Sequence, residues 1–379
     1  MPAIAALAAG LLIDGSVRTE ARGGTSVGGE DPSSAGISLD VQARTSNADG
    51  ALRFGLSPSA VLAQGRQVFV RGFGEAELRF GRRAWVRLRQ ALGYGSVDLS
   101  PVATVVAPAA GPVPVQSPPG SRFVSLEESN TSLDVDATAS RRLRIGGSAA
   151  WVVSGGADAE ARTSLPLTRG PLLRAHLDWA ATRLDMLGLE LSARDQRYSN
   201  ELHQRATVAS LTAAWRMRTG RGTELSLSLG PGIGRAEQDD QPATTVAYAV
   251  GTADLRATPW RDLSASLGAS IEPLGDPLSG EIVERGSVRA AAVWDRHRGV
   301  SVAARLNASV ALTSGTGATA PRSGDVYLQG ELSATVPLSA RSNLAVGARG
   351  AFLSRPLLNQ PEDQWVAFLS YVAQLPLLR

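Results

Sequence analysis

The sequence predicts an all-β protein: a closed, antiparallel, up-and-down transmembrane β-barrel of about 18 strands, with about 16 as the alternative count. Three observations lead to this prediction. Apolar and polar residues alternate with a period of two along most of the chain. The alternating segments are longer than usual globular strands, and short turns between them take turns with longer loops.

Residues 300–312 show the alternation clearly. Val302, Ala304 and Leu306 fall on one face of the expected strand, while Arg305 and Asn307 fall on the other. Runs of this kind extend over about 10 to 14 residues, against about 5 or 6 for a typical globular strand. A tilted membrane strand needs about 9 to 11 residues. The length of the runs therefore favours strands that cross a membrane.

The pattern divides the chain into successive expected strands. Pro58 and the uncertain start of the first strand leave the lower strand count open, although an even number is typical of bacterial barrels. The segments are 13–23, 36–45, 51–60, 67–80, 84–98, 128–139, 143–154, 171–180, 186–198, 202–216, 222–234, 243–256, 262–273, 281–294, 300–312, 323–336, 343–353 and 364–376.

Short polar turns that contain arginine join these segments in pairs. They recur roughly every 40 residues, which is room for two strands, one short turn and one longer loop. Barrels of the outer-membrane type have this rhythm, with the short turns on one side of the membrane. The arginines are Arg141, Arg183, Arg221, Arg261, Arg298 and Arg341.

Aromatic residues gather near the same short turns and include five of the seven tryptophans. Indole rings favour the headgroup level of a membrane, where an apolar ring meets a hydrated N–H group. These residues predict an interfacial girdle at one end of the barrel: Phe80, Trp85, Trp179, Trp215, Trp260 and Trp294.

The domain organisation follows from the ends of this pattern. Residues 1–13 are apolar and rich in small residues, which predicts a signal peptide or the remnant of one, and residues 14–379 form a single barrel domain. A proline-rich loop interrupts the barrel at residues 100–127. Two interpretations of that loop stay open: a segment that folds into the lumen, and an extended surface loop.

Composition excludes several other functions. The formal net charge is only +3, and no run of basic residues interleaved with aromatics suggests nucleic-acid binding. There is no cysteine, which excludes disulfides and thiolate metal sites. His176, His203 and His297 fall on different expected strands or rims, so we expect no catalytic residues, no metal, no cofactor and no enzyme activity.

Over its whole length the chain resembles porin-like outer-membrane β-barrel proteins of Gram-negative bacteria. The alternation, the turn rhythm, the tryptophan positions and the last strand, Gln364–Leu375, carry the resemblance. That strand, with Trp365, Phe368 and Tyr371, looks like the segment by which the assembly machinery recognises such barrels. The resemblance implies the bacterial outer membrane as location, and outer-membrane lipid, lipopolysaccharide and the barrel-assembly machinery as partners. It leaves the oligomeric state open.

A barrel this wide must place its polar face inward, because apolar side chains could not fill the interior. We therefore expect a passive channel for small polar solutes. The alternatives are a non-transporting structural or binding barrel, such as a surface receptor or an envelope-assembly component, and more remotely a soluble secreted all-β repeat protein. Both charge signs occur among the expected lumen-lining residues, which are Asp134, Asp136, Arg174, His176, Asp178, Arg289, Arg305, Asn307, Gln329, Glu331 and Arg349.

Overall fold

The computed structural model describes residues 11–27, 33–62, 66–98, 123–199, 204–219, 222–238, 241–275, 281–296, 299–313, 326–354 and 362–378. These residues form 18 strands and one short helix, α2 (Ala159–Ser164). The strands are β1 (Leu12–Val27), β2 (Ser34–Ser46), β3 (Gly50–Leu62), β4 (Arg66–Phe80), β5 (Ala84–Asp98), β6 (Phe123–Thr138), β7 (Leu143–Gly156), β8 (Thr168–Ala180), β9 (Asp185–Tyr198), β10 (Arg205–Thr219), β11 (Thr223–Gln238), β12 (Gln241–Trp260), β13 (Leu263–Gly275), β14 (Ile282–Asp295), β15 (Ser301–Ala311), β16 (Val326–Ser339), β17 (Ser342–Ser354) and β18 (Glu362–Leu378).

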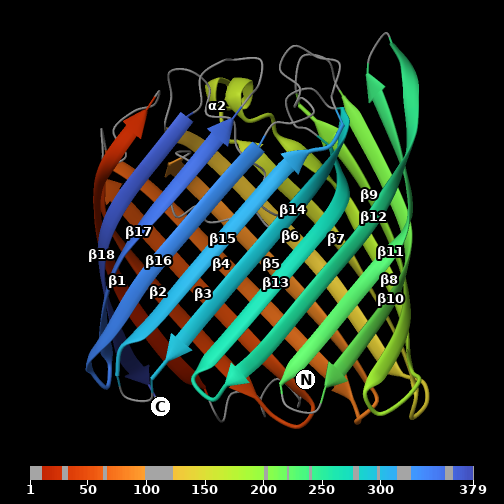
Figure 1. Cartoon of the computed structure of the whole chain (residues 1–379), viewed down its shortest axis with the longest axis horizontal. Helices are drawn as coiled ribbons and strands as arrows, with labels where there is room; N and C mark the ends of the chain where they lie inside the picture. The colour runs from red at the N-terminus through yellow and green to blue at the C-terminus, as the bar shows by residue number, and fades with distance from the viewer. Residues whose placement is uncertain are drawn as a thin grey trace.

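Every strand pairs antiparallel with its neighbours in sequence, and the first strand pairs with the last. The closing pair of β1 and β18 extends from Ile13 opposite Leu378 to Val27 opposite Asp363, with one register shift between Ile13 and Asp14. Figure 1 shows the strands inclined together around one wall. The prediction of a closed up-and-down barrel is confirmed, and its strand count is 18.

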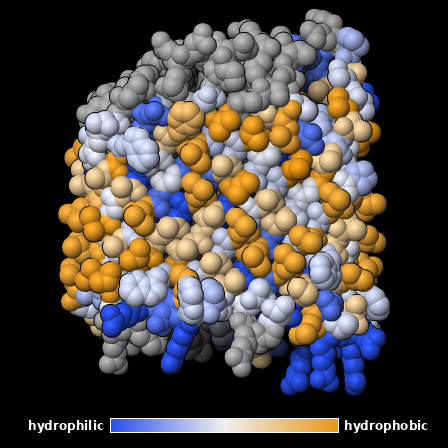
Figure 2. Space-filling model, viewed as in Figure 1, coloured by the Kyte–Doolittle hydropathy of each residue, from blue (hydrophilic) through white to orange (hydrophobic). Residues whose placement is uncertain are grey.

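The two faces of the wall differ in chemistry, as β18 illustrates. Trp365 and Leu369 are 62% and 50% exposed on the outer face, while Val366, between them, is 2% exposed. The same alternation leaves leucine, valine and phenylalanine side chains exposed on the outer face of most strands. Figure 2 shows apolar residues as a belt across the middle of the face in view, with hydrophilic residues below it.

The two ends of the barrel also differ. The start of β1, the end of β18 and the short turns lie at one end, and α2 lies at the other, which we call the α2 end (Figure 1). The β4–β5 turn contains Gly81 with a φ of 63°, a left-handed conformation that glycine adopts without strain. Pairs of strands are thus joined tightly at one end, as the recurring arginine turns predict.

The helix α2 follows β7 and packs against β6 and β7. The Asp158 carboxylate caps it by accepting a hydrogen bond of 2.8 Å from the Ala161 amide. Ala161 packs with Val124, and Val97 lies against them. This is one of two small apolar clusters in the described residues, the other being Ala351 with Val366, so no continuous apolar core fills the part of the interior that they line.

Two expected boundaries differ from the structure. β1 begins at Leu12, so the last two residues of the expected signal segment belong to the barrel wall, while residues 1–10 lie outside the described residues. β6 begins at Phe123, so residues 123–127 of the expected proline-rich loop are strand. Val124 and Leu126 pair with β5 there. Residues 99–122 of that loop lie outside the described residues.

In the part of the chain that the structure describes, no helix is long and apolar enough to cross a membrane.

Candidate functional site

A polar groove of about 770 Å³ runs along the interior wall from β10 to β16. Serine, asparagine, glutamine, arginine and carboxylate side chains line it, together with small residues. These polar residues are Arg216, Glu224, Ser226, Asp254, Arg256, Ser266, Arg289, Arg305, Asn307, Gln329 and Glu331.

The groove is built from two neighbouring cross-strand rows, in which each residue lies directly opposite the next. Period-two alternation puts both rows on the interior face. Gly268 leaves room in the first row, since a Cβ there would lie 2.7 Å from Oδ1 of Asp254. The first row is Asp254, Gly268, Arg289, Asn307 and Gln329, and the second is Arg256, Ser266, Ala291, Arg305 and Glu331.

Next to the groove, Arg349 of β17 joins two carboxylates. Its Nε lies 2.7 Å from Oε2 of Glu331, and its Nη1 lies 2.9 Å from Oε1 of Glu20 in β1. The Arg349 side chain is 4% exposed and stacks over the Phe368 ring at 4.2 Å. Both carboxylates therefore neutralise a buried guanidinium, which makes this cluster a structural part of the wall.

A second set of interior ion pairs lies on the wall of β6 to β8 and β10. Asp136 accepts hydrogen bonds of 2.7 and 2.8 Å from Nε of Arg144, and Nε2 of His176 lies 3.4 Å from the same carboxylate. Further along, Asp178 pairs with Arg216 at 3.3 Å. Both carboxylates therefore form ion pairs with arginines of the wall.

Three other interior arginines are not neutralised by a described carboxylate in this way. Arg174, Arg256 and Arg289 make no ion pair with any described residue. A guanidinium group donates five N–H bonds in a fixed fork that suits hydroxyl and carboxylate oxygens. The groove thus combines free donors with the acceptor Asp254 and the amides of Asn307 and Gln329, a set that can bind a hydroxyl-rich solute.

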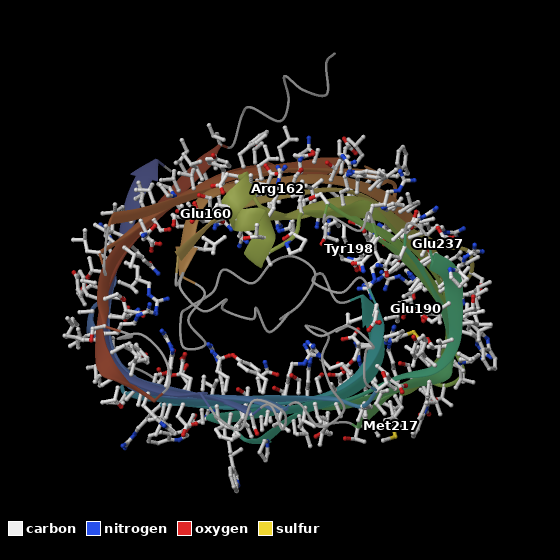
Figure 3. All side chains as sticks on the ribbon, turned by 90° about the horizontal axis from the view of Figure 1, so that it is seen from above. Glu160, Arg162, Glu190, Tyr198, Met217 and Glu237 are labelled. Atoms are coloured by element: carbon white, nitrogen blue, oxygen red, sulfur yellow. The ribbon has the colours of Figure 1, made fainter. Side chains whose placement is uncertain are left out.

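The side chains seen from above separate into an inner and an outer set. In Figure 3, Glu190 and Tyr198 lie inside the ring of strands, and Met217 lies outside. The residues predicted to line the lumen all have interior parity, but they form two groups on different parts of the wall. Arg289, Arg305, Asn307, Gln329, Glu331 and Arg349 lie in and beside the groove, whereas Asp134, Asp136, Arg174, His176 and Asp178 lie on β6 and β8.

Sequence reasoning missed several interior residues. Asp254, Arg256 and Ser266 belong to the groove, and Arg144 and Glu20 bind residues that it did identify. The alternation in each strand would have placed all of them on the polar face. What the sequence lacks is the register that brings them together.

The aromatic residues expected in a girdle are divided between the two faces. Phe80, Trp179, Trp260 and Trp294 are exposed on the outer face, with Trp260 the most exposed at 70%. The indole N–H of Trp215 donates to Oδ1 of Asp185 at 3.2 Å.

Trp85 differs from the other members of the expected girdle. It lies opposite Asp136, on the strand face that also carries Arg87, and the Arg87 guanidinium stacks over its ring at 4.8 Å. Leu88, at the other parity of β5, is the residue that is exposed on the outer face. Nearness to a turn predicted the level of Trp85 but not its face.

Among the described residues, no three His, Cys, Asp or Glu side chains are grouped so that they could hold a metal ion. His203 and His297 lie outside the described residues. His176 contacts Asp136, which Arg144 already binds. The described interior side chains therefore offer hydrogen-bond donors and acceptors, and no group of metal ligands among them.

Solved structures of outer-membrane channels and transporters share this fold. The chain is similar to OccK2 (OpdF) of Pseudomonas aeruginosa, with 13% identity, a TM-score of 0.52, and coverage of 97% of this chain and 98% of that one. A structure of OccK2 in complex with glucuronate matches with 15% identity, a TM-score of 0.51 and coverage of 96% and 98%. The FrpB iron transporter of Neisseria meningitidis matches with 9% identity, a TM-score of 0.52 and coverage of 96% and 82%.

At these identities the similarity concerns the fold, and it confirms the resemblance to porin-like outer-membrane barrels. Among curated protein sequences, none matches the chain. A family model does match: residues 77–375 fit the EpsX exopolysaccharide export family.

Proposed function

The chain belongs to the EpsX exopolysaccharide export family, and from this membership we propose that it is an outer-membrane conduit through which a polysaccharide leaves the cell. In this proposal the barrel acts as a channel and has no catalytic role. The observation that carries it is the polar interior face of a closed wall. A sugar polymer exposes hydroxyl groups along its whole length, and these need hydrogen-bond partners during passage.

The groove offers such partners in succession. Its two rows provide donors and acceptors on five adjacent strands, from β12 to β16. Conduction requires sites that bind well enough for entry and weakly enough for exit. Exposed, mixed charges such as Arg305, which is 65% exposed, meet that requirement better than a dry, fully paired pocket.

A deletion strain tests the proposal directly. We expect loss of cell-surface polysaccharide, with polymer retained inside the envelope, and recovery when the full-length gene is restored. A matched variant carries Arg256→Gln and Arg289→Gln and should fold normally but reduce export. Normal surface polysaccharide in the deletion strain would refute the proposal.

A passive channel for small polar solutes is the second candidate. The groove volume of about 770 Å³ falls within the range of about 300 to 1,000 Å³ that is usual for sites of small molecules. Liposome swelling with sugars and amino acids distinguishes the candidates. Rapid swelling together with unchanged polysaccharide export would favour the small-solute channel, and no swelling together with loss of export would favour the polymer conduit.

The outer membrane is the location that this function requires. The apolar outer belt and the closed wall support it, because membrane barrels turn their apolar face to lipid. Fractionation, with migration on a gel before and after heating, tests it. A protein that stays soluble without detergent would contradict both the location and the conduit. Assembly machinery that recognises the last strand, β18, remains a proposed partner.

A further inference from the structure

Three arginines on adjacent strands lie in one cross-strand row. Arg169 of β8 is directly opposite Arg197 of β9, and Arg197 is directly opposite Arg205 of β10. Arg205 in turn lies opposite Glu237 of β11. We call Arg169, Arg197, Arg205 and Arg235 with Asp195 and Glu237 the rim cluster.

The rim cluster is on the outer face of the barrel. Its residues lie on the same strand face as Leu173 in β8, Leu191 in β9, Leu211 in β10 and Ile233 in β11. Each of these four apolar side chains is about half exposed. The cluster therefore continues the apolar face of these strands toward the α2 end.

Its level in the membrane is marked by a tryptophan. On the next strand, Trp151 of β7 is opposite Pro171, two residues beyond Arg169, and its ring is half exposed on the outer face. Indole rings settle at the headgroup level. The α2 end is opposite the short turns, which face the periplasm in bacterial barrels. The arginine row thus lies just beyond the tryptophan level, where the polar groups of the outer leaflet begin.

Charge within the cluster is only partly compensated. Arg205 binds Asp195 at 2.7 Å and Glu237 at 3.7 Å, and Arg235 binds Glu237 at 2.8 Å. Arg169 and Arg197 are exposed and make no ion pair within the described part of the chain. Like charges directly opposite in a sheet are destabilising. An anion that bridges Arg169 and Arg197 would therefore reduce the repulsion between their guanidinium groups.

We propose that the rim cluster binds the phosphate groups of an outer-leaflet glycolipid of the lipopolysaccharide type. A guanidinium fork matches phosphate oxygens with two parallel hydrogen bonds. Thr207 places a hydroxyl beside Asp195, at 3.1 Å, within the same cluster. The acyl chains of such a lipid would lie along the apolar residues below. This site is separate from the lumen and does not depend on what the barrel transports.

The test uses full-length protein in neutral detergent with a chelator, and native mass spectrometry or a titration with bisphosphorylated lipid A. The variant is Arg169→Gln with Arg197→Gln. We expect lipid affinity to fall about tenfold or more, because the variant removes two guanidinium groups that can form charge-assisted hydrogen bonds to phosphate. Dephosphorylated lipid A should bind weakly to both proteins.

The control removes the same charge at the other rim, with Arg141→Gln and Arg142→Gln in the exposed β6–β7 turn, and should bind like the unmodified protein. Gel migration before and after heating checks that each variant is folded. Equal lipid affinity of the rim variant and the unmodified protein would overturn the proposal, as would equal loss in the control. Full competition by inorganic phosphate would show a free-anion site and overturn the assignment to lipid.

Discussion

Arg349 of β17 reaches past β18 to Glu20 of β1, where its Nη1 lies 2.9 Å from Oε1 of the carboxylate. The two residues are 329 positions apart in the sequence. Arg18 of β1 donates from Nε to the Ser370 hydroxyl of β18 at 3.0 Å. The first strand is therefore held to the last two by interior side chains as well as by the backbone ladder.

Replacing Arg349 with glutamine should weaken the closed barrel. Two partly buried carboxylates, Glu20 and Glu331, would lose their shared guanidinium, and removing one partner of a buried ion pair costs about 3 kcal/mol. Equilibrium unfolding in urea, followed by gel migration and tryptophan fluorescence, measures the loss.

Arg305→Gln provides the control for this measurement. Arg305 is 65% exposed and lies 3.8 Å from the same Glu331. An exposed pair contributes at most about 1 kcal/mol, so this variant should unfold close to the unmodified protein. If both variants lose equal stability, Arg349 does not have the special role at closure that its contacts indicate.

Neutralising the two free arginines of the groove should change the ion preference of the channel. With Arg256→Gln and Arg289→Gln, we expect the permeability ratio of cation to anion to rise about two- to fivefold. An exposed charge changes the energy of a nearby ion by up to about 1 kcal/mol in water. Reversal potentials across planar bilayers in a salt gradient measure it.

The matched control for this experiment is Arg82→Gln with Arg83→Gln, in the exposed β4–β5 turn outside the groove. It should leave the permeability ratio unchanged. An equal change in both variants would mean that net charge, rather than the position of the groove, determines the preference.

The fold could be predicted from the sequence because each strand separates two different media. A period of two needs only local information, and Leu306 beside Arg305 and Asn307 already shows which face is apolar. The strand count followed from the same signal with the recurring turns. The observed starts of β1 and β6 differ from the expected ones, because pairing extends each strand into residues that look like leader or loop.

The interior site was predicted less completely, because its contacts depend on register across distant strands. No local pattern connects Arg349 with Glu20, since the barrel must close before they meet. The prediction for Trp85 was incomplete for a different reason. Its distance from a turn placed it in the girdle, but its position on the same strand face as Arg87 was not taken into account. The rim cluster needed both parity and register, which only the closed structure supplies.

The two faces of the wall can be distinguished by tryptophan fluorescence. Trp260 is 70% exposed on the outer face, whereas Trp85 lies under the Arg87 guanidinium on the inner face. In vesicles with brominated lipid, Trp260→Phe should lower the lipid-quenched fraction of the fluorescence. Trp85→Phe should leave that fraction unchanged and lower the part quenched by aqueous iodide. The opposite pattern would contradict the assigned faces.

The cap of α2 should respond to pH through Asp158. Hydrogen bonds from the Ala161 amide and then from the Ser125 hydroxyl hold the pKa of this carboxyl below its ordinary value of 3.8. A lowered pKa means that the charged form stabilises the folded helix, so the contribution is complete above pH 3.8 and is lost as the pH falls through the lower folded value. Hydrogen-exchange protection of the Ala161 amide should decline over that acidic range. In Asp158→Ser the hydroxyl still caps the helix but does not titrate, so protection should persist without this pH dependence. Asp158→Ala should lose protection at every pH, and an unchanged profile in that variant would show that the side chain does not hold the helix.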